Sequence, residues 1–173
     1  IALLQPDNWL DQLQLICASF GVAVVYSPCI SKAPIYGAAR WIKNKSLPLI
    51  QITDRKKDYN AFWFSFYHEL AHIRYHNKSD IFIDGLDEIS PDKDKEQEAD
   101  DFAARMLISD AVRTKIESSN LKKIGEIKLF ALVNQIHLSI LISQLQRDRI
   151  IEYNDSSISM FKTKVEFDKL TFA

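Results

Sequence analysis

The segment FWFSFYHELAHIRYH, residues 62–76, constrains the fold of this chain more than any other. It contains no Gly or Pro and is strongly apolar, so we predict a long buried helix over residues 60–76. Its polar exceptions include His68, Glu69 and His72. Residues four apart lie on the same face of a helix, one turn above each other. The two histidines therefore project side by side and can hold one metal ion.

The spacing His-Glu-x-x-His has a specific chemical meaning. Zinc binds neutral imidazole, and in catalytic sites it takes three protein ligands and a water. Glu69 follows the first histidine and points along the edge of the site, where it can take a proton from that water. We predict His68 and His72 as Zn²⁺ ligands and Glu69 as the catalytic base. A pair of ordinary helical histidines is the alternative, and other divalent ions suit these ligands too.

A third ligand is expected on a second helix. One class of such sites uses a histidine ten residues after the first, with a glycine between, but Lys78 and Tyr75 occupy those positions. The segment KEQEADDFAARML, residues 95–107, instead places Glu96 and Asp100 on one helical face. We predict that Glu96 binds the metal and that Asp100 accepts a hydrogen bond from a ligand histidine, fixing its tautomer.

The neighbouring polar residues have structural explanations. Glu98 should face away from the site, and both it and Asp101 fit a solvated acidic first turn of a helix. His76 is expected at the end of the motif helix, where the helix dipole favours it. His137 is expected in a turn; a place near the site, steadying an oxyanion, is its alternative. Two tyrosines stay open as oxyanion donors: Tyr67 and Tyr75.

The rest of the chain predicts an α+β domain. Apolar periodicity and turn residues predict helices over 6–20, 96–107, 122–134 and 139–147, a strand at 22–30, a hairpin from 36–42 and 47–53, and a short strand at 81–83. We expect a small antiparallel sheet from residues 22–53, packed on the motif helix, with the other helices closing the cleft. The domain should span residues 1–150, followed by a C-terminal hairpin or tail at 151–173.

Composition excludes several classes of protein. The 173 residues are 47% hydrophobic, which suffices for a core, and the net charge of −1 gives no general attraction to nucleic acid or anionic membranes. The two cysteines lack ligand spacing and fit a cytoplasmic protein. No apolar run reaches the length of a membrane span. Because the chain begins at Ile1, we expect a missing N-terminal part, such as a DNA-binding domain.

The two motif segments together resemble the ImmA/IrrE metallopeptidase family, whose pattern is an HExxH helix followed by an E-x-x-x-[ND]-x-x-A helix. The strand LPLIQIT before the motif also fits, and the resemblance covers roughly residues 20–150. It implies a zincin-like fold with zinc at His68, His72 and Glu96 and with Glu69 as general base. The stretch FALVNQIHLSILISQLQRDRII is similar to hybrid helix-turn-helix regulators of the HigA antitoxin type, although SILISQLQ lacks their Pro-Gly.

Three functional hypotheses follow. The first is a zinc-dependent endopeptidase, for which the resemblance implies a helix-turn-helix repressor as protein substrate. The second is a non-proteolytic sensor or dimerisation half of a transcriptional regulator, a possible homodimer that reaches DNA only through the missing domain. The third and weakest is that residues 122–149 contact DNA themselves as two helices and a turn, although their apolar run ILI indicates burial. No membrane partner is expected.

Overall fold

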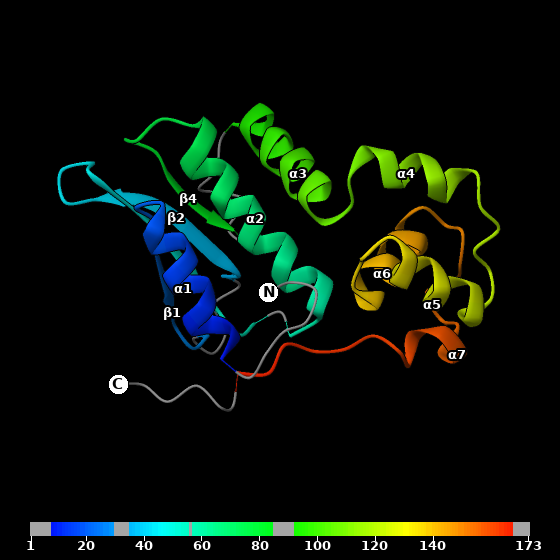
Figure 1. The fold of residues 1–173 in the computed structure, drawn as a ribbon. Coiled ribbons are helices and arrows are strands. Elements are labelled where there is room, and N and C mark those ends of the chain that lie inside the picture. The colour runs from blue at the N-terminus through cyan, green and yellow to red at the C-terminus, as the bar shows by residue number, and fades with distance from the viewer. Residues whose placement is uncertain (1–7, 30–34, 56, 85–91, 168–173) are drawn as a thin grey trace.

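The computed structural model describes residues 8–29, 35–55, 57–84 and 92–167. This part of the chain has an α+β fold with a four-stranded sheet and seven helices, which confirms the predicted class (Figure 1). Pro6, the expected start of the first helix, lies outside the described residues, as does the end of the expected tail. The elements in chain order are α1 (Trp9–Ser19), β1 (Ala23–Tyr26), β2 (Gly37–Ile42), β3 (Leu47–Ile52), α2 (Tyr59–Tyr75), β4 (Ile81–Asp84), α3 (Lys93–Leu107), α4 (Asp110–Glu117), α5 (Ile124–Val133), α6 (Leu138–Arg147) and α7 (Ser156–Ser159).

The sheet is mixed, with strand order β1-β3-β2-β4. Strands β2 and β3 form the predicted antiparallel hairpin, and β4 pairs antiparallel with the other edge of β2. Strand β1, however, pairs in parallel with β3, so the prediction of an antiparallel sheet is wrong for this strand. The reason is topological. Because β3 and not β2 lies beside β1, the two neighbours are separated by two chain reversals and run in the same direction.

One row of side chains crosses all four strands. Val24 on β1 is level with Ile50 on β3, which is level with Ala39 on β2, which is level with Phe82 on β4. All four are buried. Side chains alternate between the faces of a sheet, so this row lies on one face. Helix α2 packs against β2, β3 and β4. Phe82, at the β4 end of the row, lies beside His72 of α2.

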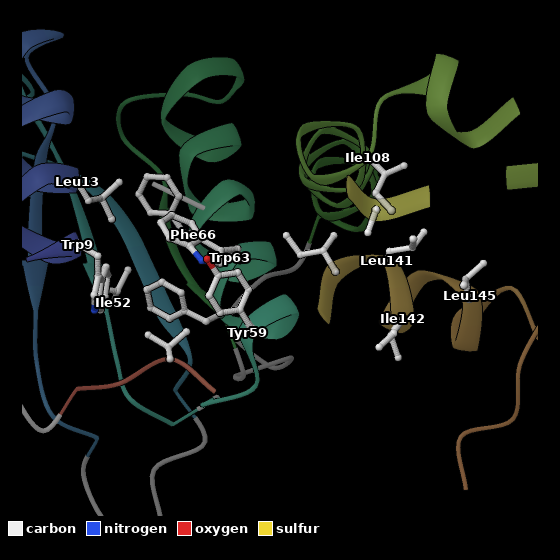
Figure 2. Close-up of a cluster of buried hydrophobic side chains, with 14 of the residues drawn as sticks. Trp9, Leu13, Ile52, Tyr59, Trp63, Phe66, Ile108, Leu141, Ile142 and Leu145 are labelled. Carbon is white, nitrogen blue, oxygen red and sulfur yellow. The ribbon is translucent and has the colours of Figure 1, made fainter. Parts of the chain in front are cut away.

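Helix α2 is held by an apolar stripe at its N-terminal half. Tyr59, Phe62, Trp63 and Phe66 recur at the spacing of one helical face and are at most 3% exposed. The Phe62 ring lies edge-on to Trp9 of α1, with centroids 5.2 Å apart. Figure 2 shows Trp9, Trp63 and Phe66 gathered between α1, α2 and the sheet. The aromatic flank of the motif is therefore core, as predicted.

Helix α3 begins at Lys93, three residues earlier than predicted. Its start is set by Asp92, whose carboxylate accepts a hydrogen bond from the backbone N–H of Lys95 at 3.3 Å. Along one side of the helix, Ala99 and Ala103 are completely buried. Helix α3 packs against α2, and these small residues allow the two backbones to approach closely.

Helices α5 and α6 form the predicted pair with a short turn. Eight of the ten residues of α6 are buried, so this helix belongs to the core and has no free face to place in a DNA groove. Figure 2 shows Leu141 and Leu145 directed into that core. No single helix among the described residues is long and apolar enough to cross a membrane. Helices α5 and α6 together pass by length and composition, but the chain bends by 119° between them.

The chain after α6 returns to the start of α2. Helix α7 is followed by extended backbone, and Lys164 forms an isolated antiparallel bridge with Asp58. Val165 and Phe167 are buried in the core, and Trp9 donates a hydrogen bond from Nε1 to the backbone oxygen of Glu166 at 3.1 Å. Residues 151–167 thus contribute to the same core as α1 and α2.

The first prediction concerns the start of α2. Asp58 accepts a hydrogen bond from the backbone N–H of Ala61 at 3.0 Å and also forms an ion pair with Lys162 at 3.2 Å. Asp58→Ala should lower the free energy of unfolding by about 1 kcal/mol, the usual value of a helix cap. Asp58→Asn keeps a cap and loses the ion pair, so it should cost much less. Equal losses in chemical denaturation would contradict the capping role.

Candidate metal centre

Three predicted ligands meet where α2 and α3 pack together. His68 Nε2 lies 2.9 Å from His72 Nε2 and 3.1 Å from Glu96 Oε2. His72 Nε2 lies 3.7 Å from the same Glu96 oxygen. Within the described part of the chain, these residues form the one group of three metal-ligating side chains whose donor atoms all lie within 4.8 Å of one another.

The triangle of donor atoms fits a metal ion. Ligand atoms arranged tetrahedrally around zinc lie about 3.3 Å from one another, and the three measured distances bracket this value. Two imidazole nitrogens at 2.9 Å need a proton or a cation between them. His68 and His72 are buried, whereas the side chain of Glu96 is 33% exposed, so the cluster is reached from the Glu96 side. Two nitrogens and one carboxylate oxygen, with one side open, match the donor set of catalytic zinc.

Packing between the helices places Glu96 within reach of the histidines. Ala71 on α2 and Ala99 on α3 are both completely buried. The start of α3 is also tied to the turn before β4, because Lys95 Nζ donates a hydrogen bond to Asp80 Oδ2 at 2.9 Å. This bond raises the pKa of Lys95. Glu96 is therefore carried by a helix that is fixed on its buried face and at its first turn.

Asp100 lies where the sequence predicted it. Its Oδ1 atom is 2.9 Å from His68 Nδ1, the ring nitrogen that faces away from the cluster. A carboxylate accepts hydrogen bonds only, so His68 carries its proton on Nδ1 and its lone pair on Nε2. This tautomer presents the nitrogen that a metal requires.

His72 is held by contacts that the sequence did not indicate. Its ring stacks on Phe82 of β4, with centroids 3.8 Å apart and planes 8° from parallel. Burial, with a smaller contribution from the neighbouring His68 and His76, lowers the pKa of His72 to about 3. The imidazole is therefore neutral at physiological pH and available as a ligand. The strand IFID could have indicated that Phe82 is buried, because alternate side chains of a strand point to opposite faces of the sheet.

His76 lies at the end of α2, as predicted, but its contact with Glu98 was not predicted. The side chain of His76 is only 3% exposed, and its Nδ1 lies 2.8 Å from His72 Nδ1. Glu98, predicted only to face away, places Oε2 3.1 Å from His76 Nε2. Glu98 does point away from the three ligands. Helix periodicity alone, however, could not show that the end of α2, with His76, lies beside Glu98. The four-residue spacing of His72 and His76 did indicate that the two histidines lie on one face of α2.

Glu69 is completely buried and points toward β2. A Cβ atom on Gly37 would lie 2.9 Å from Glu69 Oε1, closer than real Cβ atoms approach, and 3.0 Å from its Cγ, which is also tight. Gly37 therefore provides the space that the Glu69 carboxylate occupies. The sequence placed Gly37 in a strand without assigning it a role, although a glycine inside a strand often marks such a close approach.

The remaining oxyanion candidates have other surroundings, and His137 lies away from the cluster. His137 stacks on Tyr59, with ring centroids 3.8 Å apart, and burial lowers the pKa of its imidazole. Tyr59 is nine residues before His68, about 13 Å along the helix. Tyr67 lines a small cavity of about 130 Å³ together with His137, on the side of α5 and α6. Tyr75 is 46% exposed at the end of α2.

The fold and site define an α+β protein with a candidate His-His-Glu metal centre on two packed helices, as in zinc-dependent hydrolases. Residues 58–152 match the Peptidase U49 family, and the chain belongs to this family. The matched region runs from the cap of α2 to just beyond α6 and contains Glu69 and all three candidate ligands. Membership implies peptidase activity. A search of curated proteins finds no match to the chain.

The second prediction is metal stoichiometry. Protein equilibrated with zinc and then dialysed should retain one equivalent, because three donor atoms converge on one position. His72→Ala and Glu96→Ala should each retain close to none. Asp101→Ala, which removes an exposed carboxylate from the same helix, should retain the wild-type amount. Elemental analysis that finds equal zinc in all four proteins would disprove the assigned site.

Proposed function

We propose that this peptidase is a zinc-dependent endopeptidase of the zincin-like type, with the catalytic arrangement that its resemblance to the ImmA/IrrE family implies. The observation that supports this most is the convergence of His68, His72 and Glu96 with the buried Glu69 beside them in the sequence. Helix α2 carries two ligands and the base, and helix α3 carries the third ligand. Both helices lie within the region that matches a peptidase family.

The chemistry follows from these positions. His68, His72 and Glu96 would hold the ion, and three protein ligands leave a fourth position for water or substrate. When bound, zinc polarises the scissile carbonyl and lowers the pKa of the attacking water. Glu69 accepts the proton of that water and then delivers it to the leaving amine, so that the broken peptide bond ends as a carboxyl and an amine. Asp100 keeps His68 in the tautomer that binds metal.

For the substrate, we propose a helix-turn-helix regulatory protein in the cytoplasm. This proposal is supported by the pattern of the two motif helices and by the similarity of residues 130–151 to hybrid regulators. A DNA-binding domain upstream and a homodimer belong to the same proposal. Incubating the purified protein with such a regulator and mapping the products by mass spectrometry is the direct assay for cleavage.

The third prediction tests the base. Glu69→Gln keeps the size of the side chain but removes its ability to accept a proton, so cleavage should fall by about 10²- to 10⁴-fold. Zinc content should stay at the wild-type level, since Glu69 is not a ligand. Unchanged cleavage by the zinc-bound variant would refute this mechanism. If zinc-bound wild type cleaves no regulator, the result would favour the non-proteolytic sensor.

The fourth prediction concerns the space beside the base. Gly37→Ala should displace the Glu69 carboxylate and reduce kcat by about 10²-fold, the scale of a misplacement of about 1 Å in an active site. Zinc content should not change. Gly125→Ala is the matched control, because a Cβ there meets nothing within 4 Å. If the two variants have equal activity, Gly37 does not position the base.

A further inference from the structure

The two candidate ligand histidines are supported in different ways. His68 meets the Asp100 carboxylate directly through its outward nitrogen. Among the residues that the structure describes, no carboxylate meets the outward nitrogen of His72 directly. It lies 2.8 Å from His76 Nδ1, and the other nitrogen of His76 lies 3.1 Å from Glu98 Oε2. A chain of three side chains therefore runs from the cluster to a carboxylate.

We infer that His76 and Glu98 are positioning residues of the metal centre, which orient His72 through this chain as Asp100 orients His68. The inference rests on the proposed function, because it takes His72 as a metal ligand. It adds two residues to the site and assigns α3 a second task.

Hydrogen-bond chemistry allows one direction for the chain. If His72 binds metal through Nε2, its single proton is on Nδ1, which donates to His76. His76 Nδ1 must then accept, so the proton of His76 is on Nε2 and is donated to Glu98. A carboxylate only accepts, and it completes the chain without a conflict. Without Glu98 or His76, the direction of the hydrogen bonds is no longer fixed. The tautomer of His72 is then no longer fixed either.

Burial makes this chain consequential. The side chains of His72 and His76 are 1% and 3% exposed, so water cannot readily replace a missing partner. Phe82 stacks on His72 and lies 5.3 Å from the ring of His76, which restricts both rings from the side of the sheet. His76 meets His72 on the side opposite the ligand nitrogen, so it is not a fourth ligand.

Glu98 can be changed without disturbing the core. Its side chain is 56% exposed and borders an open hollow of about 540 Å³ beside α3. Helix α3 thus supplies the third ligand and both orienting carboxylates, at Glu96, Asp100 and Glu98. The contact between α2 and α3 then sets the orientation of both histidines at once.

The test measures zinc affinity of the whole chain by competition with a chromogenic chelator. His76→Leu and Glu98→Ala should each weaken binding about 10- to 100-fold, the usual effect of losing such a partner. His76→Gln should retain most of the affinity, because its amide can accept from His72 and donate to Glu98. Asp101→Ala, the matched loss of an exposed carboxylate on α3, should bind zinc like wild type. Thermal unfolding of the metal-free proteins checks that each variant is folded.

A double-mutant cycle separates a chain from two independent contributions. Because Glu98 acts through His76, the double variant should bind no more weakly than His76→Leu alone. Unchanged affinity in either single variant, or losses that multiply in the double variant, would overturn the inference while the wild-type site still binds zinc. Wild type that binds no zinc would overturn the site and the inference together. Glu69→Gln that still cleaves would refute only the proposed mechanism.

Discussion

The contact between α2 and α3 is the interaction on which the site depends. Neither helix holds a complete set of ligands, since α2 supplies two histidines and α3 supplies Glu96. The two helices pack together, and each carries a small residue that is completely buried, Ala71 on α2 and Ala99 on α3. Dispersion between such well-packed surfaces is small for each pair of atoms but large in sum. The polar cluster is therefore held by apolar packing on either side of it.

The sheet supports the same site from the other face of α2. Phe82, at the end of the buried row that crosses all four strands, stacks on His72. Gly37, two residues from Ala39 in that row, leaves the space that Glu69 occupies. The paired strands β2 and β4 thus position two residues of the site. Phe82 of β4 holds His72 by stacking, and Gly37 of β2 leaves space for Glu69 because it has no side chain. The register of β2 and β4 consequently matters for chemistry as well as for stability.

Local spacing in the sequence predicted part of this arrangement. The four-residue period that relates His68 to His72 also relates Glu96 to Asp100, and both follow from helix geometry alone. The structure places Asp100 against His68, as that geometry suggested. The hairpin of β2 and β3 could also be predicted from the sequence, because its strands and turn are adjacent in the chain. These features need no knowledge of how distant segments meet.

Three features were missed, and two of them depend on distant segments. The parallel pairing of β1 depends on which strand of the hairpin it joins. Helix α4 was not predicted, since Val112, Thr114 and Ile116 alternate like a strand and only Ile116 is fully buried. The contact of His76 with Glu98 depends on the way two helices cross, which no pattern within either helix encodes.

The central claim is that His68, His72 and Glu96 bind one ion between α2 and α3. The most direct test is a crystal structure of the zinc-loaded protein with anomalous scattering measured at the zinc edge. The account predicts a single peak about 2.0–2.2 Å from both Nε2 atoms and from a Glu96 oxygen, with one coordination position left for water. A peak at other residues, or none between these helices, would contradict it.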